Sequence, residues 1–264
     1  MKLNTPGSLN TLNQAQLQQD SLLKKLATAK RINSAADDAA GLQIANQLSS
    51  SINGKGQGER NLYDGVSLAR VYEQGLQGIN DNLGELSRLA VAAGNGIYGA
   101  QERSALQAEA DQYTANIQQV IDNTEFAGKK LFDQDGALSF GTGSGSLNLS
   151  TVDVASGLTA QNIFSIDLSS ADAAAASLGN IQQSLDYIGG LQADAGASIN
   201  SFSSAASNLN GQQIAESAAR SRIEDLDFAR ASSDKVAADI LANTSVSVSL
   251  QARMQQQQAL NLLS

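Results

Sequence analysis

The fold is decided by the stretch Ala218-Ala219-Arg220-Ser221-Arg222-Ile223-Glu224-Asp225-Leu226-Asp227-Phe228-Ala229 and its continuation to Ser264. This stretch contains neither proline nor glycine, so it favours a long helix. Its larger apolar residues are thinly spread among Ala, Ser and Gln: Leu226, Val236, Ile240, Leu250, Met254, Leu260 and Leu263. A helix with so narrow an apolar stripe buries little surface alone. We therefore expect it to pack against the amino-terminal residues of the same chain and against another copy of the chain.

The composition suits helices with narrow cores. Hydrophobic residues make up 42% of the 264 residues but aromatic residues only 4%, with one Pro and no Trp. Such a profile favours long helices whose core is one or two side chains wide over a thick globular core. We expect a mainly α fold.

The composition also excludes several kinds of site. Without Cys or His the chain has no disulfide, no thiol or imidazole catalyst and none of the usual zinc ligands. Carboxylates, Lys, Tyr and Ser remain, so an enzyme is disfavoured but not excluded, and we expect no cofactor.

Charge and hydropathy constrain the partners and the location. The net charge of −9 disfavours a nucleic-acid partner. No apolar run approaches the roughly 18 residues of a membrane span, and the amino terminus lacks the apolar region of a secretory signal peptide. The missing signal peptide is consistent with a cytoplasmic location. It is equally consistent with export by a route that leaves the amino terminus intact.

The amino-terminal region predicts a helix with a polar seam. Asn4-Thr5-Pro6 is typical of a helix start. The seam then steps alternately by three and four residues: Leu9, Leu12, Gln16, Gln19, Leu23, Leu26 and Lys30. This spacing fits one helix of a coiled coil, and it fits an ordinary amphipathic helix equally well.

A connector is predicted near 33–43. Asn33-Ser34 can end one helix, and Ser34 or the pair Asp37-Asp38 can cap the next. The two aspartates could also bind a metal or act as an acid–base pair. Since no third ligand lies nearby in the sequence, solvated caps are the favoured interpretation.

Two further helices are predicted before residue 131. Gly54, Gly56 and Gly58 indicate either a break or a close backbone contact in the first of them. Its seam then continues with regular spacing: Leu62, Val66, Ala69, Tyr72, Leu76, Ile79, Leu83, Leu86 and Ala90. Glycines 94, 96 and 99 end this helix, and another begins at Gln101 and ends at Gly128.

Between about 131 and 170 the apolar residues recur at every second position, which predicts a β-hairpin. The pairs that alternate with polar residues are Leu138/Phe140, Leu147/Leu149 and Val152/Val154. The run 141–145 is predicted to form the turn and to face solvent. A phosphate cradle is disfavoured because the sequence lacks the G-x-x-x-x-G-K-[ST] pattern and no helix follows.

Helical spacing returns at about Ser170 and is the most regular in the chain: Leu178, Ile181, Leu185, Ile188, Gln192, Ala195, Ile199, Phe202, Ala206 and Leu209. A break between two helices is predicted at 208–211.

The order helix, helix, helix, hairpin, helix, helix predicts a long antiparallel helical bundle or coiled-coil rod with a small β-hairpin at about 131–170. Residues 1–44 and 211–264 are expected to pair as terminal helices, and 45–210 to form a helical domain.

Several segments resemble bacterial flagellin, in the order in which the family has them. Residues 30–42 resemble its R-I-N-S-A-x-D-D-A-A-G-L signature, and 219–229 resemble A-R-S-R-I-E-D-x-D-Y-A. Shorter similarities occur at 60–65, 79–83, 89–91, 126–131 and 261–264. The resemblance covers 1–135 and 170–264.

The resemblance implies a structural subunit, not an enzyme, that self-assembles into the extracellular flagellar filament used for motility. The chain would be a short form without outer variable domains, exported through the flagellar type III channel. Implied partners are further copies of the chain, the flagellar cap and hook-junction proteins, and a cytoplasmic chaperone that binds the carboxy-terminal helix. Residues implied in self-assembly are Leu9, Leu12, Leu23, Leu26, Arg31, Ile32, Asp37, Asp38, Ile223, Leu226, Ile240, Leu250, Leu260 and Leu263.

The resemblance also implies two kinds of surface site. Leu89 and Glu109 match positions at which flagellins contact an innate immune receptor, whereas Glu85 replaces the family's Arg. Candidate O-glycosylation sites in the hairpin are Thr142, Ser144, Ser146, Ser150 and Thr151. An unmodified polar turn is an equally good interpretation of those residues.

Two other functions are weighed against the filament subunit. A hook–filament junction protein shares the terminal helices, but its aspartate pair is typically followed by Pro, whereas Ala39-Ala40-Gly41 follows here. A protease-bearing flagellin needs metal-binding His in a large central insertion, and this chain has no His.

Overall fold

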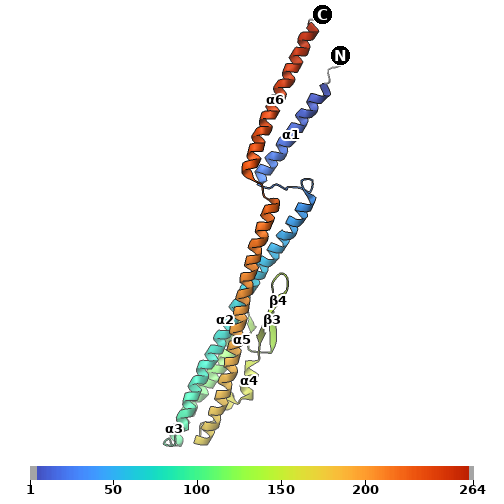
Figure 1. Cartoon of the computed structure of the whole chain (residues 1–264). Helices are drawn as coiled ribbons and strands as arrows, with labels where there is room; N and C mark the ends of the chain where they lie inside the picture. Colours follow the sequence, from blue (N-terminus) through green and yellow to red (C-terminus); the bar gives the residue numbers. More distant parts are fainter. Residues whose placement is uncertain (1–4, 262–264) are drawn as a thin grey trace. The chain divides into compact units, whose positions relative to one another are not determined.

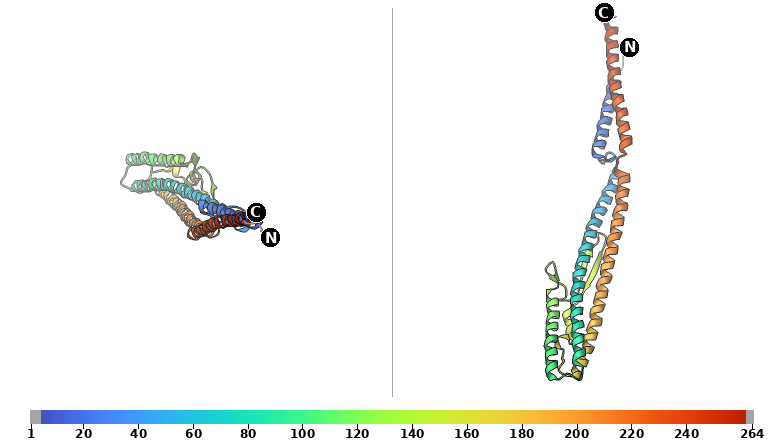
Figure 2. Two further views of the ribbon diagram at one scale, coloured as in Figure 1. Left: turned by 90° about the horizontal axis from the view of Figure 1, so that it is seen from above. Right: turned by 90° about the vertical axis from the view of Figure 1, so that its left-hand side faces the viewer.

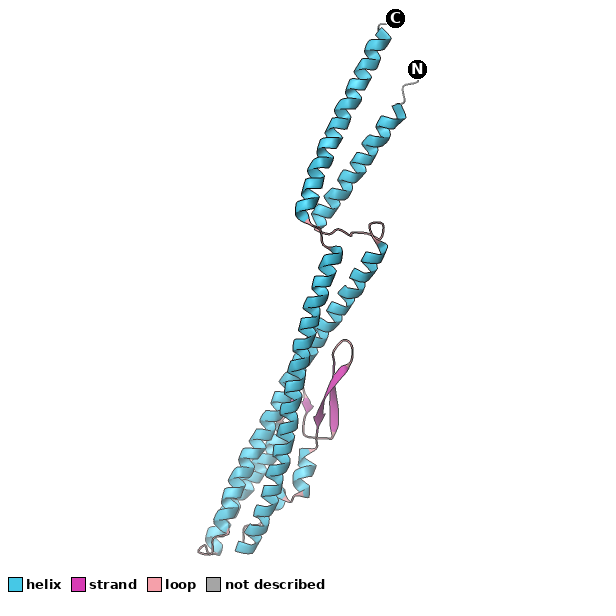
Figure 3. Ribbon diagram, viewed as in Figure 1, coloured by secondary structure: helices cyan, strands magenta, loops and turns pink. Residues whose placement is uncertain are grey.

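The computed structural model describes residues 5–261, apart from the side chains of residues 5–12, 15, 249, 252, 253, 256, 257 and 259–261. Helices dominate the described chain, and its strands form two short antiparallel hairpins (Figures 1 and 3). This confirms the mainly α fold class. The elements in order are α1 (Thr5–Thr28), α2 (Ala39–Ala93), α3 (Ala100–Asn123), β1 (Glu125–Phe126), β2 (Lys129–Lys130), β3 (Gly136–Gly141), β4 (Ser146–Thr151), α4 (Val154–Ala160), the 3-10 helix η1 (Ile163–Ser165), α5 (Ala171–Glu224) and α6 (Phe228–Asn261).

The chain divides into two compact units. We call Met1–Ile52 with Ile214–Ser264 the terminal unit and Asn53–Gln213 the central unit. The long helices α2 and α5 contribute residues to both. The predicted division of the chain into 1–44 with 211–264 and 45–210 stays a prediction.

In the terminal unit, α1 and α6 lie side by side and run antiparallel (Figures 1 and 2). The Gln19 side-chain amide donates a hydrogen bond to Asp239, which joins the two helices. At the end of α1, the backbone N–H of Leu226 donates to the carbonyl of Ala29 (3.0 Å), and that of Arg31 donates to the carbonyl of Glu224 (2.7 Å).

The prediction of one uninterrupted helix after 218 is wrong, and so is the predicted joint at 208–211. Helix α5 continues through Gly211 and ends at Glu224, and α6 begins at Phe228. The chain turns here because Asp225 pairs with Lys30 in an isolated β-bridge. Asp227 then caps α6, since its carboxylate accepts the N–H of Arg230 at 3.1 Å.

The central unit has a continuous core formed by the predicted seams. Every predicted seam residue of α2 from Leu62 to Ala90 is buried, and α5 contributes six buried seam residues. Those six are Ile181, Ile188, Ala195, Phe202, Ala206 and Leu209. Helix α3 lies along α2 and adds Ala110, Ile117 and Ile121 (Figure 2). The 3/4 spacing therefore identified this core correctly.

The β-region differs from the prediction at both ends. A separate two-residue hairpin, β1–β2, follows α3, and its turn residues Ala127 and Gly128 have φ of 51° and 78°. Both angles are positive, as in a type I′ turn. At the other end Val154 begins a short helix, because the carboxylate of Asp153 caps it by accepting the N–H of Ser156 (2.8 Å).

The turn of the β3–β4 hairpin is exposed at residues 141 and 143–145, as predicted, but it also packs on α2 through the backbone of Thr142. A Cβ at Gly58 would lie 2.8 Å from Thr142 Cα and closer still to the Thr142 carbonyl group. The side-chain amide of Asn61 also donates to the Gly141 carbonyl at 2.9 Å. Gly54, Gly56 and Gly58 therefore do not break α2, and Gly58 permits a close backbone contact instead.

Candidate assembly surface

The connector between α1 and α2 is held by two capping aspartates. One oxygen of Asp37 accepts the backbone N–H groups of Asn33 (3.0 Å) and Ser34 (2.9 Å) and the Ser34 hydroxyl (3.0 Å). The hydrogen bond from the Asn33 backbone, with those from Ser34, lowers the pKa of Asp37. Asp38 caps α2 by accepting the N–H of Gly41 at 2.8 Å. The favoured interpretation of this pair as caps is confirmed.

The same connector is joined to the end of α5. The guanidinium of Arg31 donates to the carbonyl of Ile223 (2.5 Å), and the ammonium of Lys30 pairs with Glu224 (2.5 Å). Ile32 is buried beneath this junction, 2% exposed. These contacts bring together residues from the segments 30–42 and 219–229, which lie far apart in the sequence.

Helix α6 turns its small residues toward α1. The residues of α6 that are buried or half-buried repeat every three or four positions: Ala231, Lys235, Ala238, Asp239, Ala242 and Ser245. Lys235 donates to Asp239 (2.6 Å), and this bond, followed by the one from Gln19, lowers the pKa of Asp239. The α1–α6 contact is therefore made largely by alanine and polar groups.

The large apolar side chains of α6 lie on other faces of the helix and are exposed. At 100° per residue, Val236, Ile240, Leu250 and Met254 share one stripe. Their exposed fractions are 54%, 60%, 53% and 57%. Leu241 and Val248, seven residues apart, begin a second stripe on a different side and are 64% and 57% exposed. The second stripe was missed in the sequence, because its two residues were not counted among the larger apolar ones.

The two units differ sharply in how they bury apolar surface. The hydrophobic core lies wholly in the central unit. Among the described side chains of the terminal unit, the buried apolar ones are Ile32, Ala45 and Ala231. Exposed apolar stripes of this extent mark surfaces that contact another protein. We therefore treat α1 and α6 as the candidate assembly surface.

The remaining residues predicted for assembly are placed as follows. Leu23 is 48% exposed on α1, and Leu26, Ile223 and Leu226 are half-buried. The side chains of Leu9, Leu12 and Leu260, and the whole of Leu263, lie outside the described residues. A role in assembly stays a prediction for each of them.

The predicted receptor contact needs a correction at Leu89, which is 0% exposed within the central core and so cannot touch a receptor on the folded chain. Glu85 and Glu109 are exposed and both pair with Arg88, at 2.8 and 3.4 Å. The hydrogen bond from Glu85 raises the pKa of Arg88. A positive charge is thus present near the position where the family has Arg, but two carboxylates surround it.

The glycosylation candidates also separate by exposure. Ser144, Ser146 and Ser150 are exposed on the β3–β4 hairpin and stay candidates. Thr151 is buried, 9% exposed, and Thr142 is half-buried against α2. A glycosyltransferase cannot reach a buried hydroxyl on the folded chain, so Thr151 is no longer a candidate glycosylation site.

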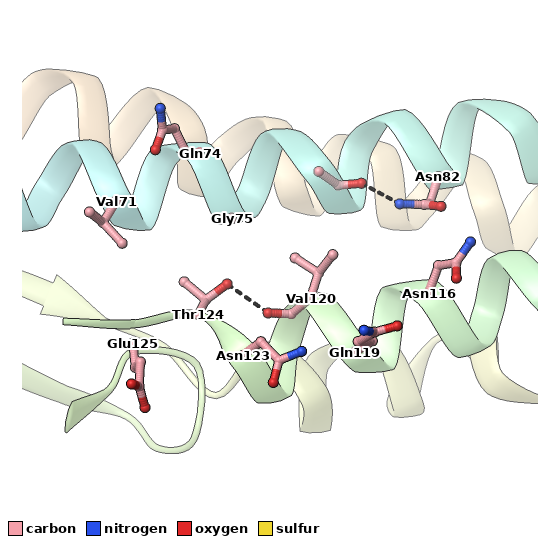
Figure 4. A pocket seen from close by; sticks show the side chains of 11 residues that line it. Val71, Gln74, Gly75, Asn82, Asn116, Gln119, Val120, Asn123, Thr124 and Glu125 are labelled. Carbon is pink, nitrogen blue, oxygen red and sulfur yellow. Dashed lines mark hydrogen bonds between the residues drawn. The ribbon is translucent and has the colours of Figure 1, made fainter. Parts of the chain in front are cut away.

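A hollow of about 600 Å³ lies between α2 and α3 (Figure 4). Its walls carry the amides of Gln74 and Asn82 on one helix and of Asn116 and Gln119 on the other. Glu125 is the one ionisable group of the lining. A lining of amides with a single carboxylate can form hydrogen bonds but offers no acid–base pair or activated nucleophile.

Known protein families match both ends of the chain. A model of the bacterial flagellin N-terminal helical region matches residues 4–137, and a model of the C-terminal helical region matches 178–263. The chain belongs to the bacterial flagellin family. This family is structural rather than enzymatic. No described helix of this flagellin-family chain is long and apolar enough to cross a membrane.

Curated relatives include the phase 1 flagellin of Salmonella naestved and the flagellin of Salmonella dublin. Each is 37% identical over 145 residues, which is 55% of this chain and 29% of the relative. The chain therefore matches under a third of the length of these flagellins.

Solved structures show the same fold at low identity. A Bacillus cereus flagellin is 23% identical with a TM-score of 0.51, covering 57% of this chain and 88% of that one. A Vibrio parahaemolyticus protein assigned as flagellar hook-associated is 13% identical with a TM-score of 0.60, covering 72% and 100%. At these identities the similarities support the fold alone.

Proposed function

We propose that this flagellin-family chain is a structural subunit that self-assembles into the bacterial flagellar filament used for motility. The observation that carries the proposal is the pair of apolar stripes on α6. Neither stripe faces α1, and both are more than half exposed. In the assembled filament, helices from other copies would bury these two uncovered apolar faces.

The physical driving force is burial of these stripes during assembly. Removing a Leu, Ile or Met side chain from water stabilises by about 1.5–3 kcal/mol. In a single copy this gain is missing, so it does not offset the conformational entropy lost when α1 and α6 become ordered. The terminal helices are therefore proposed to become fully ordered as neighbouring copies cover them.

The remaining partners follow from the same surface and from the family. The chain would be exported through the flagellar type III channel and would act outside the cell. Before export, a cytoplasmic chaperone would cover the exposed stripes of α6. In the assembled flagellum, the cap and hook-junction proteins would contact the ends of the filament.

Deletion of 1–30 or of 230–264 tests the proposal. Each deletion removes one helix of the candidate assembly surface and leaves the core of the central unit untouched. We expect no filaments by electron microscopy from either variant, and retained helical circular dichroism from the central unit. Filaments formed by either truncated chain would contradict the proposal.

A hook–filament junction protein is the second candidate, since a hook-associated protein shares the fold. Ala39, the residue after the aspartate pair, favours the filament subunit, because Pro is typical there in junction proteins. A chain that added only to hook ends, and never elongated on filament ends, would support the second candidate.

A further inference from the structure

Three Asn-Gly pairs occur in the sequence, and they differ in their backbone surroundings. They are Asn53-Gly54, Asn95-Gly96 and Asn210-Gly211. All three asparagine side chains are exposed. Asn-Gly pairs are chemically the least stable asparagine sites, because glycine has no side chain to shield its backbone nitrogen or to restrict its backbone. The local backbone structure therefore decides which of the three pairs reacts.

Two of the pairs lie in helix interiors. Gly54 belongs to α2 and Gly211 belongs to α5. In an α-helix each backbone N–H donates to the carbonyl four residues earlier, and the helical dihedral angles hold a side chain away from the next peptide nitrogen. The nitrogens of these two glycines are therefore protected unless the helix opens locally.

The pair Asn95-Gly96 lies in the loop between α2 and α3. Both residues are exposed, and the neighbouring Ile97 is 80% exposed. Within the described chain, the backbone N–H of Gly96 donates no hydrogen bond. The Gly96 nitrogen is thus open to water and is not held by another group.

The side chain of Asn95 is already folded back over this peptide. Its Oδ1 accepts the backbone N–H of Ile97 at 3.2 Å, which closes an Asx turn. This turn brings the side-chain carbonyl carbon of Asn95 toward the Gly96 nitrogen. The same hydrogen bond stabilises the negative charge that develops on Oδ1 when a nucleophile attacks that carbon.

The guanidinium of Arg103 holds the loop in place. It donates to the carbonyls of Ala93 (2.9 Å) and Asn95 (3.2 Å). The backbone N–H of Tyr98 also donates to the Asn95 carbonyl, at 3.3 Å. These bonds fix the backbone on either side of the Asx turn, and they place a positive charge where a carboxylate at position 95 would be stabilised.

We propose that Asn95 is a site of spontaneous deamidation in the folded chain. The Gly96 nitrogen loses its proton and bonds to the side-chain carbonyl carbon of Asn95. The bond from that carbon to the side-chain amide nitrogen breaks, and the amide leaves with a proton as ammonia, so that a cyclic imide remains. Water then opens the imide at either of its carbonyls, which leaves an aspartate or an isoaspartate at position 95. Both products add a negative charge to the loop beside Arg103.

Incubation of the purified full-length monomer at mildly alkaline pH tests the site. Peptide mapping by mass spectrometry would follow the conversion at each Asn-Gly pair, and an isoaspartyl methyltransferase would label the isoaspartate product. In the folded chain, Asn95 should convert about tenfold faster than Asn53 and Asn210, because those two react only after local opening of a helix. In guanidinium chloride, where the helices are unfolded, the three pairs should convert at similar rates.

The variant Gly96→Ala tests the attacking nitrogen. The φ of Gly96 is not positive and a Cβ there meets nothing within 4 Å, so the substitution is compatible with the fold. The added methyl group shields the nitrogen and should slow the conversion of Asn95 severalfold. Gly84→Ala, at another glycine where a Cβ meets nothing within 4 Å, should leave the conversion rate unchanged.

Two results would overturn the proposal. One is a conversion of Asn95 in the folded chain that is no faster than that of Asn53 and Asn210. The other is an unchanged rate in Gly96→Ala, which would mean that the Gly96 nitrogen is not the attacking group. Neither result bears on the filament proposal, because the loop belongs to the central unit and lies outside α1 and α6.

Discussion

Gly58 and Gly143 allow the turn of the β3–β4 hairpin to touch the backbone of α2. A Cβ at Gly143, where φ is +83°, would lie 2.6 Å from the carbonyl oxygen of Gly54. The sequence identified the α2 glycines as either a break or a close contact. It could not decide between the two, because the partner of Gly58 lies more than eighty residues away in the sequence.

Gly58→Ala should therefore destabilise the central unit. The new methyl group would collide with backbone, which cannot move as a side-chain end can, so we expect a loss of about 1–3 kcal/mol in the free energy of unfolding. Gly84→Ala is the matched control on the same helix, where a Cβ meets nothing within 4 Å. The control should stabilise by up to about 1 kcal/mol. Equal effects of the two variants in guanidinium chloride unfolding would refute the contact.

Asp37 makes the connector sensitive to acid. Hydrogen bonds lower its pKa in the folded chain below the ordinary value of 3.8. A lowered folded pKa means that the stabilisation is present above the unfolded value of 3.8 and is lost as the pH falls through the lowered value. The amide proton signals of Asn33 and Ser34 should titrate together in NMR, with a midpoint below 3.8.

Asp37→Asn should abolish the pH-dependent shift of the Asn33 and Ser34 amide signals. Asp20→Asn, the control variant, should leave that shift in place. A midpoint at or above 3.8 would show that the hydrogen bonds to Asp37 contribute nothing to the connector.

At the scale of elements, the helical seams were predictable and the ends of the helices were less so. The 3/4 spacing of α2 and α5 is a local signal repeated over many turns, and it identified their buried faces. The break at 225–227 was missed because no Gly or Pro marks it. It arises from pairing with Ala29–Arg31, which are almost two hundred residues away. Helix α4 was missed because seven residues are too few to establish a period.

The beginning of α6 should depend on Asp227. Asp227→Ala removes the acceptor for the N–H of Arg230 and should cost about 1 kcal/mol. Hydrogen exchange at the Arg230 amide should then become about fivefold faster, if this bond limits local opening. Asp227→Asn keeps a capping oxygen and should exchange at nearly the native rate. Unchanged exchange in Asp227→Ala would mean that the α5–α6 turn is fixed by the contacts with α1 alone.

At the scale of the whole molecule, the main feature is the unequal burial of apolar side chains. Leu83 in the central unit is 0% exposed, whereas Leu241 of α6 is 64% exposed. The sequence predicted a terminal pair with a thin seam but not that α6 would turn its alanines toward α1. In the proposed filament, neighbouring copies would cover the large residues of α6, and a single sequence does not show those neighbours.

Seeded polymerisation of the purified monomer, followed by electron microscopy and circular dichroism, tests the central claim most directly. Short sheared filaments would be added to full-length monomer and to Ile240→Asp, with Ile240→Leu as the control for side-chain size. The account predicts long filaments with a rise in helicity for the native chain and Ile240→Leu, and no growth for Ile240→Asp. Normal growth of Ile240→Asp, or a native monomer that stays soluble and fully helical, would contradict it.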